Sequence, residues 1–351
     1  MNKIKNLIYN KFSNIIIIIF SSLFFTFYSG YKGIFPIDSF LIFDAGFKVL
    51  NNYHPFKDYW TITGPFLDYI QYVFFKIFGV NWASYVLHAA TINVALSLVT
   101  FYFFCEIGLK RIYAFIYSIS TAILGYPSVG TPFMDHHATY FSFIALMYLI
   151  LALKKENFFY WLCIPLLIGF SFFSKQIPSV YLSFLFLVVI ITYLNIDKFK
   201  RSNLIYYLFY GLIIFVLICS SIIIIQKVPI NNILEQYILY PISIGQERSL
   251  NLNLDFKNIF LQFKFIYLSL IPLFFPVYHL FRIKRKKIKN LIDILILFTF
   301  LSSILIFLYS QLMTKNQILI FFLIPFCLGI SHYFINNYFK SEKLLYLIIF
   351  I

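Results

Sequence analysis

The sequence predicts an all-α, polytopic membrane protein with about ten transmembrane helices. Its 351 residues are 61% hydrophobic and only 12% charged, and the mean hydropathy is +0.85, well above the values of soluble globular domains. Charge-free runs of about 20 residues recur along the chain, and a helix of that length crosses the hydrocarbon core of a bilayer. No segment alternates in polarity as barrel strands do, so helices must satisfy the backbone in lipid.

We expect residues 1–351 to form one domain in which the spans follow one another through short connections. The expected spans are Phe12–Ser29, Trp82–Phe104, Arg111–Tyr126, His137–Leu153, Phe158–Ser174, Ile177–Leu194, Asn203–Ile225, Phe260–Phe281, Leu291–Ser310 and Ile318–Ile335. The last residues, Leu344–Ile351, are apolar but too short to span, so we expect the chain to stop within an element.

The basic residues predict the orientation of these spans. Most of the 28 lysine and arginine residues lie in alternate short connections, of which RIKRKKIK at 282–289 is the richest. The positive-inside rule assigns such connections to the cytoplasm. We therefore expect a bacterial inner-membrane protein with a cytoplasmic N-terminus, surrounded by membrane lipid. The net charge of +15 then reflects orientation and does not indicate nucleic-acid binding.

The first outer connection, residues 30–62, is the most informative part of the chain. It carries Asp38, Asp44 and Asp58, although the protein has only 13 acidic residues. Carboxylates near lipid are costly and usually functional, so these three indicate a site. The amphipathic segment that follows, residues 64–79, is expected to lie on the outer surface as an interfacial helix. If it spanned the membrane, the later basic connections would face outwards.

Other outer connections contribute further polar residues that could converge with this segment. They are Asp135, His136, Lys175, Gln176, Arg248 and Lys315. Asp135, His136 and His137 look like metal ligands, but adjacent histidines point apart on a helix and no third ligand is near in the sequence. A requirement for a divalent metal stays open, and no other cofactor is indicated. The four cysteines lack metal-like spacing and are expected to be buried hydrophobes.

Several motifs, in order, carry a resemblance to a known family. They are DSFLIFDAGFKVL at 38–50, HPFKDYW at 54–60, GPFLDY at 64–69, FFSKQIP at 172–178 and LMTKNQILIFFLIPFCLG at 312–329. This order resembles the GT-C membrane glycosyltransferases, in particular the group of aminoarabinose transferases and protein O-mannosyltransferases. That family often has Asp-Glu at the first position. Here Ser39 follows Asp38, which leaves the second acidic role to Asp44 or Asp135.

The resemblance implies transfer of a sugar from a polyprenyl-phosphate donor to a hydroxyl of a lipid, polysaccharide or protein acceptor. Asp38 would be the base that takes the acceptor proton, with Asp44 as the second catalytic carboxylate. The leaving phosphate would need cations such as Lys175, Arg248 and Lys315. The remaining candidates for substrate binding are Asp58, Asp135, His136 and Gln176.

Simpler interpretations of these residues stay open. Asp38 could cap a helix, Asp44 could pair with Lys48 at i,i+4 spacing, and Lys175 could extend towards the membrane surface. The alternative function is a transporter or flippase of a lipid-linked saccharide. Such proteins usually place ionisable groups near the bilayer midplane, whereas the expected spans here are almost free of charge.

Overall fold

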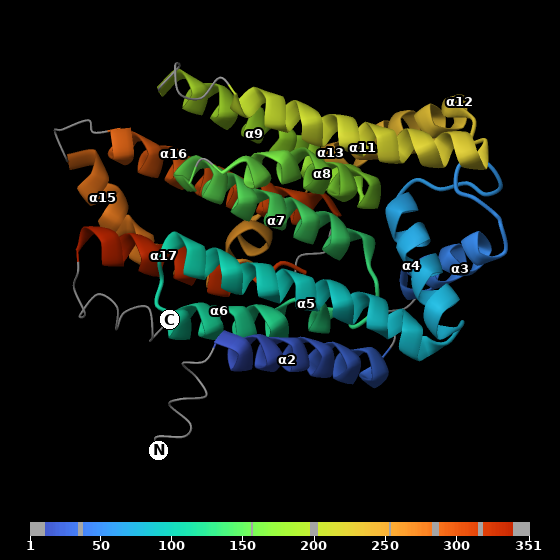
Figure 1. Cartoon of the computed structure of the whole chain (residues 1–351), viewed down its shortest axis with the longest axis horizontal. Helices are drawn as coiled ribbons and strands as arrows, with labels where there is room; N and C mark the ends of the chain where they lie inside the picture. The colour runs from blue at the N-terminus through green and yellow to red at the C-terminus, as the bar shows by residue number, and fades with distance from the viewer. Residues whose placement is uncertain are drawn as a thin grey trace.

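The computed structural model describes residues 11–33, 38–155, 157–196, 203–252, 254–282, 288–314 and 319–339, and within them every extended regular element is a helix. In chain order the helices are α2 (Lys11–Lys32), α3 (Asp38–Leu50), α4 (Pro65–Phe78), α5 (Trp82–Ile107), α6 (Arg111–Leu124), α7 (Met134–Lys155), α8 (Phe158–Ser174), α9 (Gln176–Ile196), α11 (Leu204–Gln226), α12 (Ile230–Ile233), α13 (Tyr240–Leu250), α14 (Lys264–Leu270), α15 (Phe274–Arg282), α16 (Ile288–Thr314) and α17 (Leu323–Tyr338). The long helices run side by side, with α2 and α11 on opposite sides of the bundle and α3 and α4 at one end (Figure 1).

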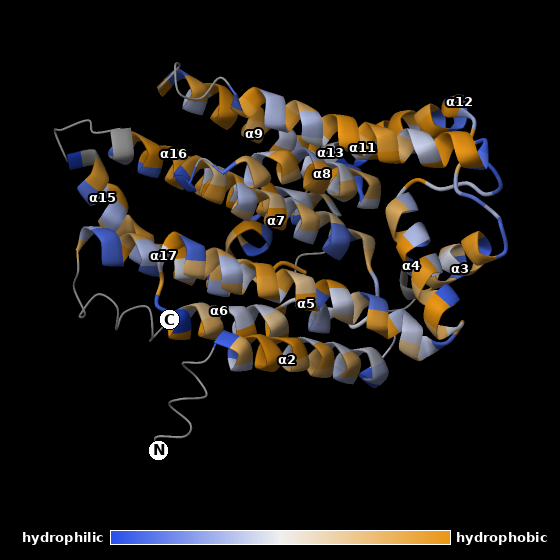
Figure 2. Cartoon of the chain, viewed as in Figure 1, coloured by the Kyte–Doolittle hydropathy of each residue, from blue (hydrophilic) through white to orange (hydrophobic). Residues whose placement is uncertain are grey.

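The predicted all-α fold is confirmed for the described residues. Within the described ranges, six helices are long and apolar enough to cross a membrane: α2, α5, α7, α9, α11 and the greater part of α16. Shorter apolar helices lie at Phe158–Ser174 and Lys264–Leu280. Apolar residues dominate the long helices, and hydrophilic residues gather at the helix ends and in the connections (Figure 2). This distribution is the one expected of an integral membrane protein.

Two regions differ in detail from the sequence-based expectation. The acidic segment 30–62 is not all connection, since it contains α3, so Asp38 and Asp44 both belong to a helix. The expected span at 260–281 is interrupted by a 3₁₀ turn at Ile271–Leu273 between α14 and α15. Pro272 in that turn lacks the N–H of a regular helix, which explains the interruption.

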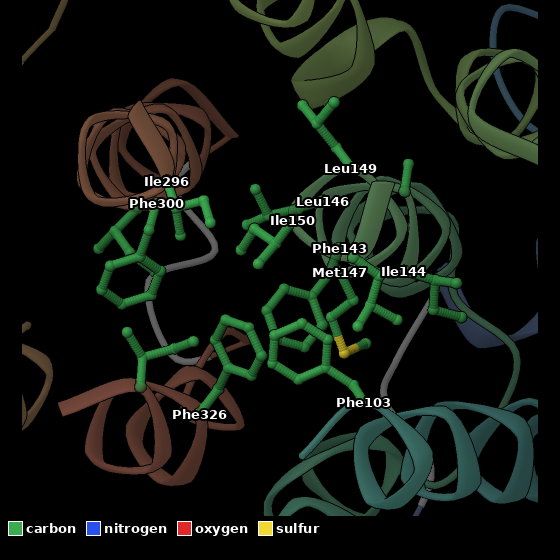
Figure 3. Close-up of a cluster of buried hydrophobic side chains, with 14 of the residues drawn as sticks. Phe103, Phe143, Ile144, Leu146, Met147, Leu149, Ile150, Ile296, Phe300 and Phe326 are labelled. Carbon is green, nitrogen blue, oxygen red and sulfur yellow. The ribbon is translucent and has the colours of Figure 1, made fainter. Parts of the chain in front are cut away.

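The core of the bundle forms around α7. In the most apolar window of α7, 89% of the residues are buried, against 6% for α11. Phe143, Leu146 and Ile150 of α7 share one buried cluster with Phe103 of α5, and the residues of this cluster on α16 and α17 include Phe300 and Phe326 (Figure 3). The rings of Phe143 and Phe326 pack edge to face with centroids 4.5 Å apart. α7 is therefore the central helix, and α11 is peripheral.

The first helix packs through a narrow stripe of mostly small or polar residues. The buried residues of α2 recur at every fourth position: Asn14, Ile18, Ser22, Thr26 and Gly30. Such a stripe lets helices approach closely in lipid, where apolar side chains alone give little preference for a partner. A Cβ at Gly30 would lie 2.6 Å from the carbonyl oxygen of Gly130, so this crossing requires glycine.

The α3–α4 pair is joined to the bundle through α5. Ile42 of α3, Leu67 and Phe75 of α4, and Tyr85 of α5 form a separate small buried cluster. The side chain of Asn81 caps α5 by accepting a hydrogen bond from the Ser84 N–H at 2.8 Å, which fixes the direction in which the chain enters that helix. The polar residues of α3 and α4 are thereby held at one end of the bundle.

Candidate functional site

One wall of the candidate site comes from α3, α4 and the connection between them. Asp44 and Lys48, one turn apart on α3, form an ion pair at 2.7 Å. The Lys48 ammonium lies 5.2 Å from the centre of the Tyr59 ring, and the Tyr59 hydroxyl donates to Asp68 Oδ2 at 2.8 Å. This wall therefore combines two carboxylates, a cation and a phenol within four side chains.

Asp68 is the buried carboxyl of this wall. It lies in the first turn of α4 and is only 1% exposed. Burial raises the pKa of Asp68 to about 7, against opposing contributions from the Tyr59 hydrogen bond and the Lys48 charge. Burial also raises the pKa of Tyr59 well above its ordinary value. A carboxyl that titrates near neutral pH in a cleft is a candidate for general acid–base chemistry.

The facing wall comes from the ends of α7, α8 and α9. Lys175 directly follows α8, and its ammonium forms an ion pair with Asp135 Oδ1 at 2.6 Å in the first turn of α7. Both side chains are largely withdrawn from solvent, with exposed fractions of 16% and 7%. Screening is weaker here than at an exposed surface, so this pair contributes more to the local field than a surface ion pair does.

Hydrogen bonds from later elements hold the first outer segment against this wall. The Gln176 side chain donates to the carbonyls of Ile62 at 2.9 Å and Tyr237 at 3.0 Å. The backbone N–H of Thr61 donates to Gln236 Oε1 at 3.0 Å. Gln176 thus has a clear structural role: its amide links parts of the chain that are far apart in sequence.

The two walls and α13 enclose a cleft of about 570 Å³. Three of the residues that line it are the cations Lys48, Lys175 and Arg248, and three are the carboxylic acids Asp44, Asp68 and Asp135. Trp60 also lines the cleft, and its half-exposed ring packs edge to face on Tyr240 at 5.7 Å. Within the described part of the chain, Arg248 forms no ion pair.

The cleft brings together five of the residues proposed from the sequence, two others lie outside it, and two have side chains outside the described part of the chain. Asp44, Asp135, Lys175, Gln176 and Arg248 line it. Asp58 instead orders its own loop by accepting a hydrogen bond from the His54 N–H at 2.8 Å. His136 is fully buried, its Nε2 lies 3.0 Å from Ser128 Oγ, and it is not among the lining residues. Asp38 begins α3, but its side chain, like the whole of Lys315, lies outside the described residues.

No group of three or more His, Cys, Asp or Glu side chains within the described ranges could hold a metal ion. As expected for neighbours on a helix, His136 and His137 point to different partners. His136 faces Ser128, and His137 Nε2 lies 2.9 Å from His88 Nε2. The described side chains therefore provide no metal centre at this motif.

An apolar groove of about 150 Å³ lies next to the cleft. Its lining includes Pro65 and Phe66 at the start of α4, Phe173 of α8, and Phe215 and Ile222 of α11. Thr63 lines the cleft, and Pro65, two residues later, lines the groove. The groove contributes almost no polar surface, so its lining suits a hydrocarbon chain better than a polar group.

Sequence analysis assigned no role to Asp68 or Tyr59, which both line the cleft. The sequence did contain a signal for Asp68. It is an isolated carboxylate among the aromatic residues of an amphipathic segment, and that segment begins at Gly64-Pro65. Its contact with Tyr59 was not visible in the sequence. Comparison of the chain with protein-family models, curated proteins and solved structures finds no match.

Proposed function

We propose that this chain is an integral-membrane glycosyltransferase of the GT-C type. It would transfer a sugar from a polyprenyl-phosphate donor to a hydroxyl of a lipid, polysaccharide or protein acceptor. The proposal includes ten spans, a cytoplasmic N-terminus, α4 at the membrane interface and a site on the outer face of a bacterial inner membrane. The observation that carries it is the single cleft in which the acidic segment of α3 and α4 meets Asp135, Lys175 and Arg248.

The charges of the cleft support an anionic donor. Asp44 and Asp135 are each neutralised by a lysine. Asp68 is close to half protonated at neutral pH, because burial raises its pKa to about 7. Arg248 then adds a positive charge that no described carboxylate balances. An arginine binds phosphate through two parallel hydrogen bonds, which suits the head group of a lipid phosphate and stabilises it as it leaves.

The reaction needs a base for the acceptor hydroxyl. Among the described side chains, Asp68 is the candidate for this base. As the hydroxyl oxygen bonds to the anomeric carbon, the carbon–oxygen bond to phosphate breaks and the phosphate leaves with the electron pair. The hydroxyl proton passes to the carboxylate, and this single displacement inverts the anomeric configuration. Proton transfer of this kind typically contributes about 10²–10⁴-fold. Asp38, the base that the resemblance implies, is the competing candidate.

The apolar groove beside the cleft supports a lipid-linked donor. A polyprenyl chain in the groove would pack against Phe66, Phe173 and Phe215 while its phosphate lay at the cleft. Each CH₂ group removed from water contributes about 0.8 kcal/mol, although a chain that moves from lipid gains less. The groove would therefore align the donor more than it would increase its affinity.

Radiolabelled transfer from a panel of polyprenyl-phosphate sugars into membrane fractions tests the proposal. We expect transfer by the intact protein and a loss of about 10²-fold or more in the variant that lacks the base. Asp68→Asn and Asp38→Asn are compared, with Asp58→Asn as the matched control because Asp58 only orders its loop. Normal turnover in both test variants would rule out this catalytic assignment. Movement of the lipid-linked sugar across sealed vesicles without transfer would support the flippase instead.

A further inference from the structure

Four polar side chains form a hydrogen-bonded chain inside the bundle, next to the cleft. They are Gln71 of α4, His88 of α5, His137 of α7 and Tyr126 of the 3₁₀ turn at Tyr126–Ser128, and none of them is exposed. Gln71 Oε1 lies 2.9 Å from His88 Nδ1, and His88 Nε2 lies 2.9 Å from His137 Nε2. His137 Nδ1 is hydrogen-bonded to the Tyr126 hydroxyl.

The protons in this chain can all point in one direction. With Gln71 Oε1 as acceptor, His88 donates through Nδ1 and its Nε2 must accept from His137. His137 Nδ1 is then an acceptor for the Tyr126 hydroxyl. Rotation of the Gln71 amide reverses every bond and leaves the chain intact. His137 Nδ1 then donates to the Phe133 carbonyl, 3.2 Å away, as well as to the Tyr126 oxygen. Two neutral imidazoles therefore complete it, and removal of either ring leaves buried polar atoms without partners.

The ends of the chain are attached to opposite walls of the cleft. Gln71 lies one helical turn after Asp68 on α4. At the other end, the Phe133 N–H donates to the Tyr126 hydroxyl at 3.3 Å, and Asp135 follows two residues later. Phe133, Asp68 and Asp135 all line the cleft. The chain thus links the element that carries Asp68 to the element that carries Asp135.

We propose that Gln71, His88, His137 and Tyr126 act as a strut that fixes Asp68 relative to Asp135, with Gln71 and His88 as positioning residues for the reaction. This inference rests on the proposed function, because only a reaction at the cleft would require Asp68 to be held in place. General packing does not require these polar groups, since well-packed apolar residues of similar volume often serve a core equally well. The Gln71 Nε2 atom is itself buried without a partner, so the amide position is unfavourable for stability alone.

Carbodiimide labelling tests the strut without a transferase assay. Dicyclohexylcarbodiimide reacts with protonated carboxyls in apolar surroundings, and mass spectrometry of the Asp68 peptide measures its labelling against pH in purified protein. In the wild type we expect a midpoint near the pKa of Asp68, about 7. His88→Leu removes both imidazole bonds and loosens α4, so water should reach Asp68 and lower the midpoint by about 1 pH unit or more.

Two control variants distinguish a loss of Asp68 positioning from a general loss of folding. His88→Gln retains a donor and an acceptor in one side chain, so its midpoint should stay close to that of the wild type. Thr91→Ala on the same helix is the matched control, because the Thr91 hydroxyl is exposed and donates only to the Leu87 carbonyl. If His88→Leu does not fold, Gln71→Leu replaces it. An unchanged midpoint in the folded leucine variant, or an equal shift in His88→Gln, would overturn the proposal.

Transfer measurements then distinguish the strut from the proposed function. Where transfer occurs, the leucine variant should lose about 10-fold in kcat with donor KM nearly unchanged, because a misplaced base weakens only the transition state. A midpoint shift in a protein without any transferase activity would reject the proposed function and leave the strut in place. A loss of donor affinity with normal kcat would contradict the positioning role.

Discussion

Replacing Asp68 by asparagine should stabilise the protein, and the gain should grow with pH. Burial raises the pKa of Asp68 from 3.8 to about 7. Between these values the unfolded chain has lost the proton that the folded protein still binds, so the folded state becomes less stable as pH rises through this window. One pKa unit corresponds to about 1.4 kcal/mol, which makes the full penalty roughly 4 kcal/mol above pH 7. About 3 kcal/mol of it develops between about pH 5 and pH 8.

Thermal unfolding in detergent, followed by circular dichroism over this pH range, measures the effect. Asparagine has no charge to bury and keeps an oxygen that can accept from Tyr59, so the stability of Asp68→Asn should depend less on pH. Asp58→Asn is the matched control, because Asp58 lies ten residues before Asp68 and orders a loop. Parallel pH profiles of the wild type and Asp68→Asn would refute the reasoning. A more stable but inactive variant would indicate that function maintains this carboxyl.

Three further predictions follow from the orientation, the cleft and the packing of α2. A cysteine at Ser249 should react with an impermeant thiol reagent added outside intact cells, whereas one at Lys287 should not, and the reverse labelling would invert the assigned topology. Lys175→Ala should raise the donor KM about 10-fold, while Lys287→Ala should leave it unchanged; equal effects would remove Lys175 from the phosphate site. Gly30→Ala should lower stability by about 1–3 kcal/mol, because the new Cβ meets a backbone carbonyl at 2.6 Å. Gly33→Ala, with nothing within 4 Å, is its control in the same thermal unfolding measurement, and equal melting temperatures would contradict the packing argument.

The sequence predicted the helical class because that property depends on composition and run length alone. It also predicted that Asp44, Asp135, Lys175, Gln176 and Arg248 could converge, and the cleft brings them together. Carboxylates and cations are scarce in this chain, which made that prediction possible. Each one in an outer connection is therefore informative.

The parts that sequence reasoning missed depend on contacts between distant residues. The perturbation of Asp68 requires its burial against Tyr59, and no local pattern encodes the contact. His136 illustrates the opposite error, because a histidine next to an outer connection suggested a binding role, whereas its ring is buried beside Tyr126 and Tyr140. A break such as the one at Pro272 was foreseeable from the proline itself.

The central position of α7 has a consequence for how the protein is made. Its early partner is α5, but α16 and α17, which cover it in Figure 3, are synthesised well over a hundred residues later. Until then α7 must reside in the membrane without Phe307 and Phe326, the later aromatic partners of Phe143, and its buried Ser142 needs a polar partner. Ser171 of α8 supplies that partner, since the two Oγ atoms are 2.6 Å apart and α8 is the next helix to be synthesised. We expect α7 and α8 to enter the bilayer as a hairpin, and the newly made protein to gain its cleft only after α13 has been added.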